Sequence, residues 1–139
     1  MTGTIVKSKN YNARMKWPNQ SVANAVWAEN TGSEGVGVCP SGTGWTGYNL
    51  ALDVPGTYLV TAYALFATAS GGFRGLRIYK NNNSQGEGFT APSGHYTWVT
   101  FSRIVESNGN DTVRMGLYQN SGATITVHDI FITAIYLGE

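Results

Sequence analysis

Residues 111–139 have the sequence DTVRMGLYQNSGATITVHDIFITAIYLGE, which predicts two long strands separated by a turn at residues 120–122. The first strand carries apolar side chains at alternate positions (Val113, Met115 and Leu117), as expected of a strand with one buried face. The second strand runs almost to the C-terminus, and its DIFITAIYL segment is apolar on both sides. A strand with two apolar faces is usually covered on both. One face would close the core of a sandwich, so we expect the other to meet a further partner, such as another copy of the chain.

The middle of the chain continues the β pattern. Strands are predicted where β-branched and aromatic side chains cluster or alternate, at residues 48–54, 57–68, 73–80 and 95–105. The second and third of these are expected to form a hairpin, because only a short glycine-rich break separates them. Residues 81–94 predict a polar loop, since they are rich in Asn, Gln, Gly and Ser. No segment longer than ten residues supports an amphipathic helix, and roughly eight to ten short, evenly spaced strands favour an antiparallel sandwich or barrel.

The N-terminal part is less regular. Residues 1–20 predict an arm or linker before a single β domain over residues 21–139, with short strands at residues 4–6 and 15–17. Four of the nine basic residues lie in this arm. They fit a patch for nucleic acid or acidic polysaccharide, but we favour a solvated arm or a segment that docks on the rest of a longer protein. Residues 21–30 fit a strand or a helical turn, and we favour the strand.

Composition limits the function classes. Charged residues make up 12% of the 139-residue chain and the net charge is +1, so no bulk electrostatic field would attract nucleic acid or an acidic membrane. The single cysteine, Cys39, excludes an internal disulfide and a cysteine-based metal cluster, and we expect it to be structural. No apolar run reaches the ~18 residues of a membrane span, and the N-terminus has no signal-peptide pattern. We therefore expect export by another route, release by cell lysis, or a trimmed fragment.

Motifs for catalysis are lacking. The eight carboxylates are scattered along the sequence, whereas a glycosidase needs two of them about 5–9.5 Å apart across a cleft. His128 and Asp129 are adjacent, and neighbours on a strand point to opposite faces, so they would not form a dyad. The sequence contains no G-x-S-x-G elbow, no P-loop and no metal-ligand spacing. We expect a protein that is not an enzyme, with no cofactor and no metal site.

Saccharide binding makes demands that the sequence can meet. A sugar presents apolar C–H faces and a ring of hydroxyls, so its site needs an exposed aromatic ring beside planar polar groups. Four tryptophans and eight tyrosines exceed the need of one core. One candidate platform is Trp45, with Tyr48 and Asn49 nearby, although Trp45 fits a structural role equally well.

A second candidate platform consists of His95, Tyr96 and Trp98, with Arg77 and Asp129 as partners for sugar hydroxyls. Each has a structural alternative. Trp98 fits a core position on a central strand, and Tyr96 fits interface packing. Asp129 fits a partner for backbone groups at the start of the last apolar segment, and Arg77 fits an ion pair between subunits.

Two segments resemble a known superfamily. PGTYLVTAYALF, at residues 55–66, resembles the central strand of the C1q/tumour-necrosis-factor jelly roll, and residues 111–139 resemble its last strands. The resemblance covers residues 50–139. It implies a jelly-roll β-sandwich of about eight to ten antiparallel strands, assembled as a homotrimer with the last strand near the threefold axis. The interface residues that it implies are Ile130, Ile132, Ile135 and Leu137.

The composition, which has few charged residues and is rich in Gly, Asn, Ser and Thr, resembles that of head domains of receptor-binding proteins from tailed phages of Gram-positive bacteria. This resemblance implies a non-catalytic host-adhesion domain of a tail fibre or baseplate protein that binds cell-surface saccharide. It further implies a place at the virion tail tip, assembly in the host cytoplasm and action outside the cell. Other tail proteins would contact the N-terminal side, with no nucleic acid bound and no membrane insertion. Two alternatives are a C1q-like domain that binds a protein partner, and a carbohydrate-binding module of a larger glycoside hydrolase.

Overall fold

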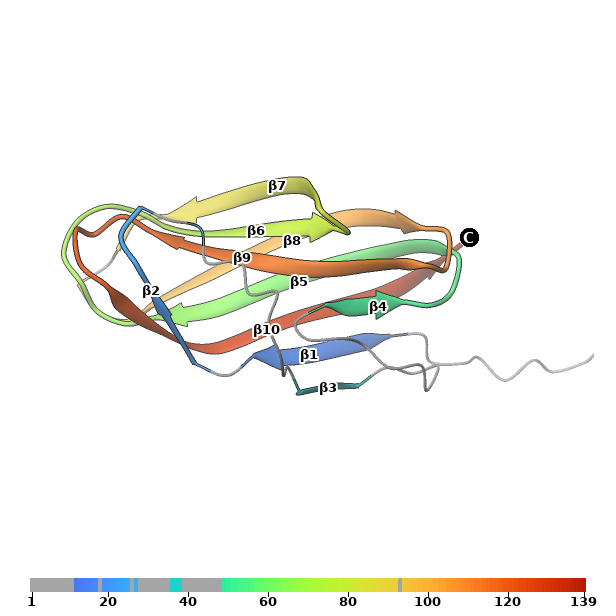
Figure 1. Ribbon diagram of the computed structural model, residues 1–139, viewed down its shortest axis with the longest axis horizontal. Helices are drawn as coiled ribbons and strands as arrows, with labels where there is room; N and C mark the ends of the chain where they lie inside the picture. Colours follow the sequence, from blue (N-terminus) through green and yellow to red (C-terminus); the bar gives the residue numbers. More distant parts are fainter. Residues whose placement is uncertain (1–11, 18, 26, 28–35, 39–48, 93) are drawn as a thin grey trace, which may run out of the picture.

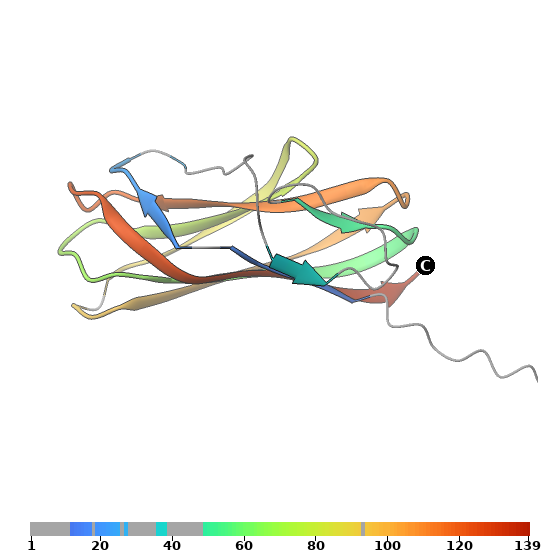
Figure 2. The ribbon, with the colours of Figure 1, turned by 60° about the horizontal axis from the view of Figure 1, so that its bottom comes forward.

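The computed structural model describes residues 12–17, 19–25, 27, 36–38, 49–92 and 94–139. In this part of the chain all regular structure is β, arranged as two antiparallel sheets packed face to face (Figures 1 and 2). Most strands run along the long axis of the molecule, and the C-terminus lies at one end (Figure 1). No helix among these residues is long and apolar enough to cross a membrane. The predicted all-β sandwich is confirmed.

The larger sheet has the strand order β3-β1-β10-β5-β8, and β2 pairs with the first part of β10. Its members are β1 (Ala13–Trp17), β2 (Gln20–Val22), β3 (Val36–Val38), β5 (Gly56–Phe66), β8 (Thr97–Ser107) and β10 (Ile125–Gly138). The smaller sheet has the order β4-β9-β6-β7. Its members are β4 (Leu50–Leu52), β6 (Arg74–Lys80), β7 (Asn83–Thr90) and β9 (Asp111–Gln119). We call them the six-stranded and the four-stranded sheet.

β10 lies in the middle of the six-stranded sheet, between β1 and β5. Its side chains Val127, Ile130 and Ile132 are fully buried in the core between the sheets. Positions 127 and 130 would face opposite sides of a regular strand. A β-bulge at Asp129, whose φ is 47°, brings both inward. β9 and β10 both form where the sequence predicts strands, but they belong to different sheets, so the turn between them crosses the sandwich.

The predicted interface residues divide between the two faces of β10. Ile130 and Ile132 are fully buried within one chain, so their assignment to an interface with another copy is wrong. Ile135 and Leu137 are outward and are 43% and 55% exposed. Residues on one face of a strand are two apart in sequence, and the predicted set combined even and odd positions. The two-sided apolar character of β10 is confirmed, because its outward face also carries Phe131.

β5 and β6 do not form the predicted hairpin. β5 pairs with β8 and β10, whereas β6 pairs with β7 and β9. The connection crosses between the sheets through Gly71 and Gly72, which both have positive φ. The buried guanidinium of Arg74 donates hydrogen bonds to the carbonyl oxygens of Ala69 (2.7 Å) and Gly71 (3.0 Å), which stabilises this crossing. Alternating apolar residues identify a strand, but not the sheet that the strand joins.

β7 forms within the segment predicted as a polar loop, residues 81–94. It is the edge strand of the four-stranded sheet, and among the described strands it pairs only with β6. Its side chains are exposed or half-buried, so the apolar alternation of a buried strand is not required. The true hairpin is β6–β7, and its turn contains Asn81 with a φ of 54°, a conformation that Asn tolerates.

β1 corrects the expected boundary at residue 20. Strand formation near residues 15–17 is confirmed, but the strand is part of the six-stranded sheet, and Ala13, Met15 and Trp17 are buried in the common core. The sandwich therefore begins no later than Ala13, and this part is no separate arm. Of the predicted strand over residues 21–30, residues 21 and 22 belong to β2 and Asn24 and Ala25 form a turn, while residues 26 and 28–30 lie outside the described residues. The predicted strand at residues 4–6 and Cys39 lie outside the described residues.

Candidate functional site

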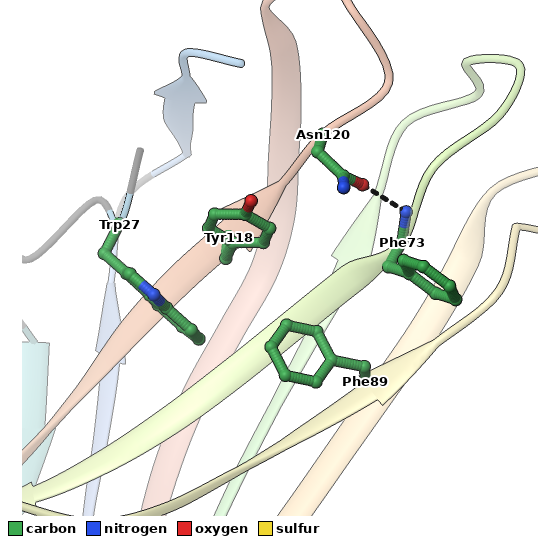
Figure 3. A pocket seen from close by; sticks show the side chains of 5 residues that line it. All are labelled: Trp27, Phe73, Phe89, Tyr118 and Asn120. Atoms are coloured by element: carbon green, nitrogen blue, oxygen red, sulfur yellow. Dashed lines mark hydrogen bonds between the residues drawn. The ribbon is translucent and has the colours of Figure 1, made fainter. Parts of the chain in front are cut away.

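A pocket of about 460 Å³ lies on the outward face of the four-stranded sheet. The residues that line it are Trp27, Phe73, Phe89, Tyr118 and Asn120 (Figure 3). Tyr118 follows the buried Leu117 on β9, and Phe89 is an exposed residue near the end of β7. The site lies where β9 ends and β6 begins, at the end of the sandwich away from the C-terminus (Figure 1).

Two glycines on adjacent strands form the floor under the aromatic rings. A Cβ atom at Gly75 on β6 would lie only 2.5 Å from a ring carbon of Phe89. A Cβ atom at Gly116 on β9 would lie 3.1 Å from a ring carbon of Trp27. The rings of Phe89 and Trp27 can therefore lie directly against the sheet, because both positions lack a side chain.

Three of the lining rings contact one another. The ring centres of Trp27 and Tyr118 are 5.0 Å apart, and those of Phe89 and Tyr118 are 5.9 Å apart with their planes at 86°. Trp27 and Phe89 complete the triangle at 6.0 Å. Tilted and edge-to-face pairs at these separations are favourable. The rings therefore support one another and form an apolar wall that does not depend on a ligand.

Arg77 lies over the ring of Trp27. Its guanidinium carbon lies 4.0 Å from the centre of the Trp27 ring, a cation–π contact. Its Nε donates to Glu87 at 2.6 Å and its Nη1 to the hydroxyl of Tyr79 at 3.1 Å, and Nη2 completes an ion pair with Glu87. Burial lowers the pKa of Arg77, but the bonds to Tyr79 and Glu87 outweigh this and leave the pKa raised. Arg77 therefore stays charged, and Glu87 compensates its charge.

Trp27 is placed by the chain just before it. The backbone N–H of Ala25 donates to the carbonyl oxygen of Gln119 at 2.8 Å. The side chain of Asn24 accepts from the backbone N–H of Gly122 at 2.8 Å. The buried side chain of Gln119 donates to the carbonyl oxygen of Val22 at 2.9 Å. Residues 22–25 are thus fastened to the end of β9 and to the turn that follows it.

Asn120 supplies the polar end of the pocket. The backbone N–H of Phe73 donates to Asn120 Oδ1, and the N–H of Asn120 donates back to the carbonyl oxygen of Phe73 at 3.3 Å. The hydroxyl of Tyr118 points toward the Asn120 end of the pocket, while Phe89 lies toward the other end (Figure 3). The site therefore joins an apolar wall to a small polar edge.

The sequence-predicted site residues do not come together at this pocket. Of those within the described residues, Arg77 alone lies beside it, and it acts there through Trp27. Asn49 is half-buried just before β4. Trp45 and Tyr48 lie outside the described residues.

The second predicted platform lies on the other side of the sandwich. Trp98 is on the outward face of β8 and is 52% exposed, so the core alternative for it is wrong. Tyr96 is exposed and stacks on His128 with ring centres 5.7 Å apart. His95 is exposed just before β8, and Asp129 is half-buried at the bulge of β10. Because Arg77 is on the four-stranded sheet, it cannot complete a site with these residues.

The pocket residues themselves were missed at the sequence level. Tyr118 could have been found, because the alternation of Val113, Met115 and Leu117 places it on the opposite, outward face. Phe89 was visible only as an aromatic residue within an apparent polar loop. Trp27 gives no signal in the sequence, since it reaches the pocket through contacts between distant segments.

The outward face of the six-stranded sheet is the second notable surface. Ile104, Leu59 and Ile135 are paired across β8, β5 and β10 and form an apolar row. A further row contains Tyr63 and Phe131, whose rings stack 5.0 Å apart at 17°. Arg14 on β1 covers Phe131, with its guanidinium carbon 4.3 Å from the ring centre. Contiguous exposed apolar surface of this kind usually marks an interaction site.

No family model and no curated protein matches the sequence. Solved structures do match the fold. The PRD1 vertex protein P5 superimposes with a TM-score of 0.65 at 16% identity, covering 94% of this chain and all of that chain. Murine APRIL at pH 5.0 superimposes with a TM-score of 0.63 at 15% identity, covering 91% of this chain and 98% of that chain. Murine APRIL at pH 8.5 gives 0.61 at 13% identity, covering 91% and 99%. The fold is therefore the C1q/TNF-like jelly-roll sandwich that the sequence predicts.

Proposed function

We propose that this chain is the non-catalytic head domain of a virion adhesion protein, which binds a cell-surface saccharide as a homotrimer. The observation that carries the proposal is the preformed aromatic pocket over Gly75 and Gly116. The fold likeness to the PRD1 vertex protein supports a place in a virion. A phage tail tip and a Gram-positive host are the more specific form of this proposal, and they rest on the composition of the chain.

The pocket suits a sugar ring chemically. Aromatic rings pack against the apolar C–H face of a pyranose, while a few placed polar groups fix its orientation. Trp27, Phe73 and Phe89 supply aromatic surface, and Tyr118 and Asn120 add polar groups at one end. The described lining residues include no carboxylate and no histidine. They offer groups for binding, which supports adhesion over glycoside hydrolysis.

The homotrimer would use the outward face of the six-stranded sheet. Three copies around an axis form a closed ring through one repeated contact between two different patches. The apolar row of Ile104, Leu59 and Ile135 is suitable surface for such a contact. When the second patch also lies away from the four-stranded sheet, assembly leaves the pocket of every copy accessible, because the pocket lies on that sheet.

The first test measures the mass of the full chain in solution by light scattering, where we expect three copies. The second measures adsorption to Gram-positive cells and to their purified wall polysaccharide. Trp27→Ala should weaken binding by about 2 kcal/mol, roughly 30-fold, as expected for a buried aromatic contact. Trp98→Ala is the matched control, since it removes an exposed tryptophan from the other sheet.

Three results would overturn parts of the proposal. A monomer would remove the trimer, and would favour a carbohydrate-binding module. Unchanged adsorption by the Trp27→Ala protein would remove the pocket as the receptor site. Loss of adsorption in Trp98→Ala with an intact trimer would move the site to the second predicted platform.

A further inference from the structure

The orientation of the Asn120 side chain is fixed by its partner. The backbone N–H of Phe73 can only donate, so the atom that faces it is the carbonyl oxygen Oδ1 of Asn120. The amide nitrogen Nδ2 must then point the other way. No hydrogen-bond acceptor for it is found among the described residues. The polar edge of the pocket therefore presents an N–H donor that is ready for a ligand oxygen.

The hydroxyl of Tyr118 lies at the same end of the pocket (Figure 3), and it too has no hydrogen-bond partner in the described part of the chain. A phenol can donate or accept. Next to these two groups stand the rings of Trp27 and Phe89, which form the apolar wall with Tyr118. A fitting ligand group thus combines a carbonyl-type acceptor with a small apolar end a short distance away.

The charges around the pocket narrow the choice of ligand further. Arg77 contacts the aromatic wall, and its guanidinium is already engaged by Glu87, Tyr79 and the Trp27 ring. An anionic ligand would have to give up hydration without gaining a free cationic partner. The site accordingly favours a neutral ligand over phosphate-bearing or carboxylate-bearing sugars.

We propose that the pocket recognises the acetamido group of a neutral N-acetylated amino sugar. Asn120 Nδ2 donates to the acetamido carbonyl oxygen, the acetyl methyl group packs on Trp27 and Phe89, and the Tyr118 hydroxyl bonds an adjacent polar group. This inference rests on the proposed saccharide-binding function and specifies the sugar class for the same pocket.

The test is a titration of the full-length chain, labelled with ¹⁵N, with N-acetylglucosamine, glucosamine, glucose and N-acetylneuraminic acid. N-acetylglucosamine should shift the signals of the Trp27 indole N–H and the Asn120 side-chain amide. Glucose and glucosamine should bind at least about tenfold more weakly, because each leaves the amide donor unpaired. N-acetylneuraminic acid, which adds a carboxylate, should also bind more weakly.

The Asn120→Asp variant removes the amide donor but keeps the oxygen that accepts from Phe73. The aspartate retains an oxygen for the N–H of Phe73 but has no N–H to donate, so the preference for N-acetylglucosamine over glucose should disappear. Tyr118→Phe keeps the ring wall and should retain that preference. A folded Asn120→Asp protein that keeps the preference would overturn the role of the amide.

Failure of this inference differs from failure of the proposed function. Equal binding of glucose and N-acetylglucosamine at the pocket signals would overturn the acetamido assignment and leave saccharide binding standing. Adsorption to wall polysaccharide that depends on Trp27, without any shift from the acetylated sugar, would also overturn it. Absence of both sugar shifts and adsorption would overturn the two together.

Discussion

The guanidinium of Arg77 lies over the ring of Trp27 at 4.0 Å, and the carboxylate of Glu87 holds it there. This contact links the pocket to a strand register, because Arg77 and Glu87 face each other across β6 and β7. The position of an aromatic ring from the N-terminal part of the chain is thus set by an ion pair at the sheet edge.

Replacing Arg77 by Ala should weaken ligand binding while the sandwich remains folded. The variant loses a cation–π contact of about 0.5–2 kcal/mol, so the Trp27 ring is less well held. Arg77→Lys should be intermediate, since it keeps the charge but not the planar fork that bonds Glu87 and stacks on the ring. Binding isotherms of each variant with purified wall polysaccharide measure the change in affinity. Wild-type affinity in the Ala variant, with unchanged thermal stability, would contradict the role of Arg77.

Replacing Gly75 by Ala should displace the ring of Phe89. The new methyl group would lie 2.5 Å from the ring, closer than packed carbon atoms approach. The cost in unfolding free energy should largely vanish in a Phe89→Ala background, where no ring is present, while ligand binding stays weak. A double-mutant cycle by urea denaturation measures this coupling, expected at about 0.5–3 kcal/mol. Additive effects would mean that the glycine floor does not support Phe89.

Ile135→Lys and Ile132→Lys form a matched pair on β10. Ile135 is outward and partly exposed, so a lysine there should separate the copies and leave a folded monomer. Ile132 is fully buried, and a lysine in its place would carry a charge into the core, which costs several kcal/mol and should prevent folding. Light scattering and circular dichroism distinguish the outcomes. A trimeric Ile135→Lys protein would exclude this face from the interface.

Asp111 should make the fold sensitive to acid. Burial raises the pKa of its carboxyl group, but bonds from the Asn81 side chain (2.9 Å) and the Asn108 N–H (2.9 Å), with the nearby Lys80, lower it below its ordinary value. The stabilisation is therefore present above the unfolded-state pKa of about 4, and is lost as the pH falls through the lower folded-state value.

The test is Asp111→Asn, which should lower the unfolding free energy at pH 7 by about 1–3 kcal/mol and flatten its fall at acid pH. Urea denaturation at pH 7 and pH 3 measures both effects. Glu106→Gln removes an exposed carboxylate and is the control. Equal acid sensitivity of the wild type and Asp111→Asn would show that other groups dominate.

The sequence predicted the positions of the strands better than the pairing between them. The alternation of Val113, Met115 and Leu117 correctly identified β9, because a buried face imposes period two on any strand. The same rule cannot tell which sheet a strand joins, so β5 and β6 were paired in error. It also fails at the edge: β7 has one neighbour and no buried face, and its polar sequence looks like a loop.

Local sequence patterns could not predict the pocket. Its lining comes from positions as far apart as Trp27 and Asn120, and these meet only because the chain before Trp27 is hydrogen-bonded to the end of β9. The predicted interface set mixed the two faces of β10, because it combined even and odd positions and side chains alternate along a strand. The bulge at Asp129 was equally invisible in the sequence, since a count of apolar positions does not reveal a single positive-φ residue.

The placement of the pocket and the apolar row on opposite sheets has a consequence for strength of attachment. A trimer that buries the outward face of the six-stranded sheet carries three complete pockets, and each pocket is formed by residues of a single copy. A surface with repeated glycans can then engage several pockets at once, and the second contact forms at high effective concentration. Individually weak and rapidly reversible contacts would add up to firm attachment, while a single free sugar could not hold the protein.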